Sequence, residues 1–146
     1  MNKENSIGRW ISILYRYGQI YVGKRLKPFG IGKGQFMYLI KLFEKDGLTQ
    51  DELSEKLSMD KGTTARALLK LEEQGYIFRE ENIHDRRSNQ VFLTEQAKNM
   101  KSDLFSVLHD WTEILSQNFS EEERQQVLFL LDRMSNNAAE YICKNR

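Results

Sequence analysis

A change of hydrophobic period within residues 49–94 restricts the fold of this chain more than any other feature. Thr49 and Glu52 match a capping box, which predicts the start of a short helix. Asp60 is a favourable N-cap for a second helix, which should end at Gly75. Two helices joined by about three residues, the second of them amphipathic, predict a helix-turn-helix.

The residues that follow this second helix no longer have a helical period. The runs YIFRE (76–80) and QVFLT (90–94) are β-prone, and the polar segment ENIHDRRSN (81–89) between them contains turn formers. Two strands directly after a helix-turn-helix make a winged helix, with Arg86 and Arg87 at or near the tip of the wing. We therefore expect a mainly α fold of the α+β class, built around a winged helix-turn-helix.

Helical segments precede this region. Before the only proline, Pro28, apolar residues recur at spacings of three and four and mark one face of a long helix; they are Ile7, Trp10, Ile11, Leu14, Tyr17, Tyr21 and Val22. A break at KPFGIGKG (27–34) follows. A second helix is expected over about residues 35–45, and its inward-facing residues should be Phe36, Leu39, Ile40 and Phe43.

Two more helices are expected after the wing. A long amphipathic helix should run over residues 94–118, and Ser120 with Glu123 forms a second capping box for the final helix. In that final helix the stretch VLFLLDRM (127–134) is apolar around most of the circumference. A surface helix normally has one apolar stripe, so this one must be covered from more than one direction.

We interpret the flanking helices as a dimerisation unit. Residues 1–146 then form a single domain, in which residues 1–30 and 118–146, with part of 94–117, are dimerisation helices. Residues 33–93 form the winged helix-turn-helix lobe. The alternative is that the terminal helices close a bundle within one chain.

The composition, 40% hydrophobic and 29% charged, is that of a globular protein. A net charge of +1 does not indicate general coating of nucleic acid, although residues 1–45 hold nine Lys and Arg against two acids.

No apolar run approaches the roughly 18–20 residues of a membrane span, and the N-terminus lacks the pattern of a secretory signal. The single cysteine, Cys143, excludes an intramolecular disulfide, and we expect a cytoplasmic protein.

The second helix of the helix-turn-helix has the residues of a recognition helix. Its exposed side should carry Gly62, Thr63, Arg66 and Lys70, with Lys61 at its start. Small residues allow the backbone to approach a groove, hydroxyls bind phosphates or base edges, and an arginine can bind guanine through two hydrogen bonds. The alternative is an ordinary capped helix with a solvated polar face.

The wing arginines indicate a second DNA contact. A basic side chain on a hairpin beside a helix-turn-helix can reach the adjacent minor groove, which has a strong negative potential where it is narrow. Asp85 can accept a hydrogen bond from Arg87 and hold its guanidinium extended, and Arg86 adds a further charge. A solvated turn with an incidental ion pair is the alternative.

The segments LTQDELSEKLSMDKGTTARALLKLEEQGYIFRE (48–80) and DRRSNQVFLT (85–94) resemble the winged helix of the MarR (multiple antibiotic resistance regulator) family of transcription factors. The resemblance includes the flanking helices. It implies a dimer bound to a pseudo-palindromic operator, with Asp85 and Arg87 as the wing pair and the exposed residues named above as recognition-helix positions. Leu69 departs from the family pattern, in which this position is often polar.

The resemblance also implies a response to an effector. Family members often lose DNA affinity when a small phenolic or lipophilic molecule enters a crevice between the dimerisation helices and the winged helix. Aromatic residues that can line such a crevice here, or belong to the core instead, are Trp10, Tyr15, Tyr17, Tyr38 and Trp111. Some relatives sense oxidants through a cysteine in the first helix, where this chain has none.

The residues together with the resemblance therefore predict a homodimeric, double-stranded-DNA-binding repressor, and the resemblance implies that a small effector releases it. The alternative is a winged-helix module that binds protein. Neither His84 nor His109 has a nucleophile or metal-ligand spacing near it, and the chain has no Gly-rich phosphate loop. We accordingly expect no enzymatic activity, no cofactor and no metal.

Overall fold

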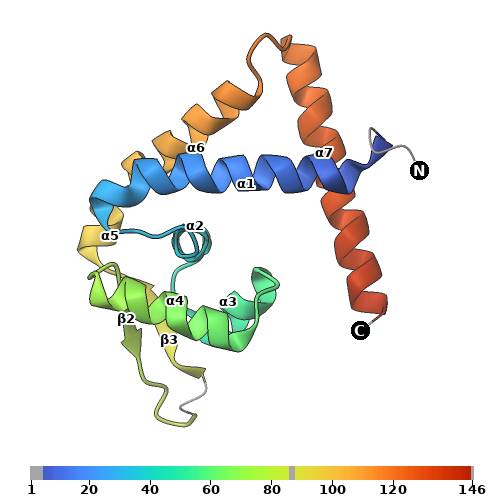
Figure 1. The fold of residues 1–146 in the computed structure, drawn as a ribbon. Coiled ribbons are helices and arrows are strands. Elements are labelled where there is room, and N and C mark those ends of the chain that lie inside the picture. The colour runs from blue at the N-terminus through green and yellow to red at the C-terminus, as the bar shows by residue number, and fades with distance from the viewer. Residues whose placement is uncertain (1–4, 86–87, 146) are drawn as a thin grey trace. The chain divides into compact units, whose positions relative to one another are not determined.

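The computed structural model describes residues 5–85 and 88–145, and the chain divides into two compact units, Met1–Trp111 and Thr112–Arg146 (Figure 1). The elements of the first unit are α1 (Ile7–Leu26), the 3-10 helix η2 (Lys27–Phe29), α2 (Phe36–Glu44), β1 (Leu48–Thr49), α3 (Gln50–Lys56), α4 (Lys61–Glu73), β2 (Ile77–Glu80), β3 (Gln90–Leu93), α5 (Glu95–Asn99) and most of α6 (Lys101–Leu115). The second unit contains the end of α6 and helix α7 (Glu121–Lys144).

The predicted helix-turn-helix is present as α3 and α4, and the capping residues named from the sequence begin their helices. Thr49 and Glu52 form a capping box at α3, and the Asp60 side chain accepts the Thr63 N–H at the start of α4. Ser120 and Glu123 form the second capping box, at α7. These side chains satisfy backbone N–H groups that have no partner within the first helical turn.

The predicted wing is present as the antiparallel pair β2 and β3 (Figure 1). Its register places Ile77 opposite Leu93 and Phe78 opposite Phe92. Ile77 and Leu93 are buried, whereas the Phe78 and Phe92 rings stack on the other face at a centroid distance of 5.5 Å. This alternation is the period of two expected for a strand with one buried face. The fold is therefore mainly α with a small sheet, as predicted.

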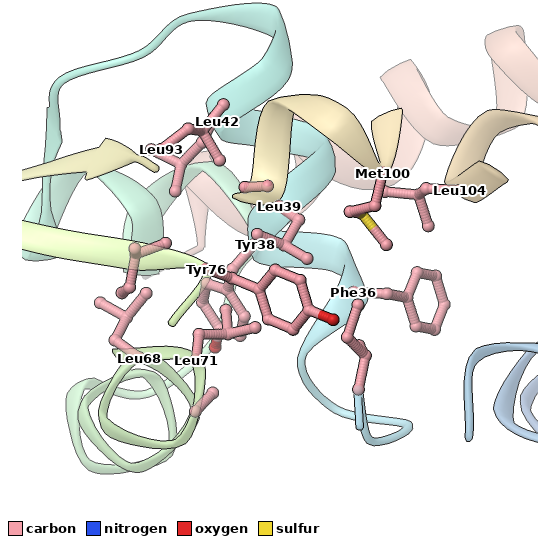
Figure 2. Packing of buried hydrophobic residues seen from close by; sticks show 14 of the residues in the cluster. Phe36, Tyr38, Leu39, Leu42, Leu68, Leu71, Tyr76, Leu93, Met100 and Leu104 are labelled. Carbon is pink, nitrogen blue, oxygen red and sulfur yellow. The ribbon is translucent and has the colours of Figure 1, made fainter. Parts of the chain in front are cut away.

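A continuous core joins the helix-turn-helix to the elements on either side of it. Leu68 and Leu71 of α4 are completely buried and lie close to Tyr38 of α2 (Figure 2). Met100 and Leu104 extend the same cluster into α6. Burial of this kind fixes which face of α4 points outward.

Three features differ from the sequence expectations. The helix expected over residues 94–118 is interrupted at Met100, whose backbone leaves helical geometry while its side chain stays in the core. A third strand, β1, pairs with β3 and was not predicted. In α2 the buried residues are Phe36, Tyr38, Leu39 and Leu42, whereas Ile40 and Phe43 are only partly buried.

Most of the predicted apolar face of α1 is exposed to solvent in the single chain. Among its residues only Val22 and Leu26 are buried, and Ile7, Trp10 and Leu14 are exposed. Within the part of the chain that the structure describes, no helix is both long and apolar enough to cross a membrane.

Candidate nucleic-acid interface

Helix α4 presents the residues predicted for DNA binding on its outer face. Thr64, Ala67, Leu68 and Leu71 are buried. The predicted contact residues are exposed, except Thr63, which is half-buried; they are Lys61, Gly62, Thr63, Arg66 and Lys70. Leu69 lies on the exposed side as well, with 49% of its surface accessible. Helix α4 is therefore anchored on one face and exposed on the other, the division that a recognition helix requires.

The start of α4 is tightly hydrogen-bonded. The Asp60 carboxylate accepts the backbone N–H and the hydroxyl of Thr63, each at 2.7 Å. Both bonds lower the pKa of Asp60 below its ordinary value, and the bond from the Thr63 backbone N–H has the larger effect. At the same end, the Lys61 ammonium is 3.7 Å from the carboxylate of Asp51 in α3.

A buried hydrogen bond fixes α4 against α2. The hydroxyls of Tyr38 and Thr64 are 3.0 Å apart, and both residues are completely buried. Thr64 lies on the buried face of α4 together with Ala67, Leu68 and Leu71. A threonine among leucines on a buried helix face is a signal that such a partner must exist, because a buried hydroxyl without a hydrogen bond is unfavourable.

We expect Tyr38→Phe to lower the free energy of unfolding by about 1–3 kcal/mol, because it leaves the Thr64 hydroxyl buried without this partner. Urea denaturation measures the loss. In the double variant Tyr38→Phe/Thr64→Val both hydroxyls are gone, so the combined loss should be smaller than the sum of the single losses. Simple addition of the two losses would show that the hydroxyls do not depend on each other.

Arg79 of β2 connects the wing to both helices of the helix-turn-helix. Its Nη1 donates to the Gln50 side chain of α3 at 3.2 Å, and its Nε lies 3.6 Å from the Glu72 carboxylate of α4. Sequence reasoning missed this residue, since its partners lie on two other elements of the fold. The two contacts join β2 to α3 and α4.

Hydrogen bonds connect the described residues on either side of the wing tip. The Asp85 N–H donates to the Asn82 carbonyl at 3.2 Å, and the Ser88 N–H donates to the Asp85 carbonyl at 3.1 Å. The Asn82 amide also donates to the Ser88 hydroxyl at 3.1 Å. The predicted arginines of the wing, Arg86 and Arg87, lie outside the described residues, so the proposed Asp85–Arg87 contact stays a prediction.

The aromatic residues predicted to line an effector crevice do not share one environment. Tyr38 is completely buried in the core, which agrees with the alternative given for it, whereas Trp10, Tyr15 and Tyr17 are exposed on α1. Trp111 is half-buried and stacks on Tyr21 at a centroid distance of 5.1 Å. The role of these residues in effector binding stays a prediction.

Trp111 belongs to a contact between α1 and α6. A Cβ at Gly18 would lie 3.1 Å from the Trp111 indole nitrogen, so the glycine allows the close approach. Nearby, Arg25 is 3.1 Å from the Asp110 carboxylate. The hydrogen bond with Asp110 raises the pKa of Arg25 above its ordinary value.

The family model described as MarR family matches residues 31–88. An uncharacterized HTH-type transcriptional regulator, YybA of Bacillus subtilis, is 30% identical over 133 residues, which cover 91% of this chain and 89% of that protein. The crystal structure of a MarR transcriptional regulator from Methanosarcina mazei Go1 is 47% identical with a TM-score of 0.90, and the match covers 92% of this chain and 97% of that one.

A putative MarR family regulator from Listeria monocytogenes, solved in complex with a 26mer DNA, is 25% identical with a TM-score of 0.86. That match covers 96% of this chain and 95% of the Listeria chain. These relatives are transcriptional regulators, in agreement with the prediction that the chain is not an enzyme. This chain therefore belongs to the MarR family of transcriptional regulators.

Proposed function

We propose that this chain is a homodimeric repressor that binds a pseudo-palindromic site in double-stranded DNA. Helix α4 enters the major groove, and the β2–β3 hairpin reaches the adjacent minor groove. The observation that supports this most strongly is the division of α4 into a buried apolar face and an outer face with Lys61, Arg66 and Lys70. The Listeria regulator of similar fold was solved with DNA, which adds support.

In this proposal residues 33–93 form the DNA-binding lobe. Residues 1–30 and 118–146, with part of 94–117, form the dimerisation helices. Support for the second assignment comes from the exposed apolar side chains of α1 and α7, such as Trp10 and Phe129, which a single chain leaves in water. A symmetric dimer places its two recognition helices on half-sites about 34–36 Å apart.

Single substitutions test the two proposed DNA contacts. Arg66→Ala should weaken operator binding by about 1–3 kcal/mol and relax the preference at one base-pair position. Arg87→Ala should weaken binding to many sequences alike, because attraction to the minor groove and backbone depends little on the base. Selection of bound sites from random duplex DNA gives the operator, and gel shifts at fixed salt measure both effects.

Lys98→Ala is the matched control, because it removes one positive charge from α5, outside the proposed contact surface. It should change operator affinity much less than either arginine variant. Unchanged binding by both arginine variants would remove the proposed mechanism. A module that binds protein instead would show no selected operator and no steep fall of DNA affinity with salt.

Repression is released, in this proposal, by a small aromatic or lipophilic effector. The only tryptophans, Trp10 and Trp111, are both candidate effector contacts, so intrinsic fluorescence reports directly on them. Titration with salicylate, a small phenolic acid, should change this fluorescence and lower operator affinity over the same concentration range. A fluorescence change without loss of DNA binding would mean that the chain binds salicylate but that this binding does not regulate operator affinity.

A further inference from the structure

Three side chains in the first turns of α4 form a connected network. The Asp60 carboxylate accepts the Thr63 backbone N–H and the Thr63 hydroxyl at 2.7 Å each. The same hydroxyl oxygen accepts a hydrogen bond from Nη2 of Arg66 at 3.3 Å. A chain of contacts therefore runs from the N-cap to the arginine of the outer face.

Gly62 leaves space for the arginine in this network. A Cβ placed at Gly62 would lie 3.3 Å from Nη1 of Arg66 and 3.4 Å from Oδ1 of Asp60. The Arg66 guanidinium thus lies back along the helix toward its N-terminal turn and does not extend away from it. That end of a recognition helix is the one whose side chains contact base edges.

The directions of these hydrogen bonds determine which partner receives the Thr63 hydroxyl proton. A carboxylate only accepts hydrogen bonds, and a hydroxyl has one proton to donate. The bonds from Thr63 and the positive charge of Arg66 lower the pKa of Asp60, so its charged, accepting form is favoured. The Thr63 hydroxyl therefore donates its proton to the Asp60 carboxylate, and the Thr63 hydroxyl oxygen accepts a hydrogen bond from Arg66.

We propose that Thr63 acts on DNA through Arg66, as a positioning residue that holds the guanidinium over Gly62 at the N-terminal end of the recognition helix. This inference rests on the proposed function. The hydrogen bond uses one terminal nitrogen of a group with five N–H donors, so donors remain for a base edge. Ordering a flexible side chain before binding removes part of the entropy loss that association otherwise carries.

Thr63→Val tests the positioning role. Valine has the same branched shape and keeps the backbone N–H that binds Asp60, but it lacks the hydroxyl. Operator affinity should fall by roughly three- to tenfold, the range expected for immobilising one long side chain. Thr63→Ser restores the hydroxyl and should recover most of the affinity. Gel shifts at fixed salt measure all variants, and thermal unfolding confirms that each is folded.

The decisive comparison repeats Thr63→Val in the Arg66→Ala background. If Thr63 works through Arg66, removal of its hydroxyl has no further effect there. An equal loss in both backgrounds would show a direct contact between Thr63 and DNA and would overturn the proposal. Equal or tighter operator binding by the Thr63→Val single variant would overturn it too.

Gly62→Ala provides a second variant that should not harm folding, because alanine is the better helix former. Whatever part of its effect on operator binding comes from crowding the Arg66 guanidinium should vanish when Arg66 is alanine, whereas a direct clash of the new methyl group with DNA should remain. If the wild-type chain binds its operator and Arg66→Ala does not change that, the positioning role is wrong while DNA binding stands. If the wild-type chain selects no operator, the proposed function fails with it.

Discussion

Leu68→Ala should lower the free energy of unfolding by about 2–5 kcal/mol, the range for removing a large side chain from a packed core. Leu68 lies on α4 and has 0% of its surface exposed. It packs in the cluster that holds α4 against α2 and the sheet (Figure 2). Truncation loses the transfer free energy of the buried methyl groups and leaves a cavity, because neighbouring elements relax only partly. Urea denaturation measures the change.

Leu69→Ala is the matched control for this prediction. The residue is the next one on the same helix and has the same side chain, but 49% of its surface is exposed. Its truncation should change the free energy of unfolding by no more than about 0.5 kcal/mol. Equal losses at the two positions would mean that α4 is rotated about its axis. The outer face that carries Arg66 and Lys70 would then be assigned wrongly.

Local sequence signals predicted the helix-turn-helix because its boundaries are set by neighbouring residues. The Thr49–Glu52 capping box and the Asp60 N-cap each act over three residues, so they can be read without tertiary contacts. The wing was predictable for a similar reason, since a β-prone run on each side of a polar turn specifies a hairpin.

Features that depend on distant partners were not predictable in this way. Strand β1 exists because Leu48 pairs with Val91, and two residues carry no strand pattern of their own. Buried apolar residues recur at helical spacing both before and after Met100, so the hydrophobic period alone does not reveal that the helix is interrupted there. The Arg79 contacts with Gln50 and Glu72 likewise join segments that only the fold brings together.

The candidate site was predicted in part. Helical periodicity gave the exposed face of α4 correctly, because the buried positions lie on one side. Periodicity did not show that Thr63 is bonded to both Asp60 and Arg66, since rotamers and hydrogen-bond directions are not encoded in spacing. The sequence therefore placed these residues on one exposed surface of α4 but gave each an independent role.

Two charges in the apolar stretch of α7 should convert the proposed dimer into monomers. The side chains of residues 127–131 are all exposed, Phe129 by 63%, and the stretch covers more than a full helical turn. Leu128→Glu with Leu131→Glu places carboxylates on one side of this stretch, where a second copy would have to bury them unpaired. Because a monomer contacts only one half-site, operator affinity should fall by roughly 10²- to 10⁴-fold.

Sedimentation equilibrium measures the dimer, and gel shifts measure operator affinity. Gln126→Glu with Asn137→Glu adds the same two charges to polar, exposed positions of α7 and is the matched control. The control should stay dimeric. Any weakening of DNA binding that it shows therefore measures how much the two added negative charges repel the DNA phosphates at long range. If the Leu128/Leu131 variant remained dimeric with control-like affinity, this side of α7 would not be covered by a second chain. The symmetric two-site model would then need another interface, because one exposed recognition helix per chain reads only half of a palindrome.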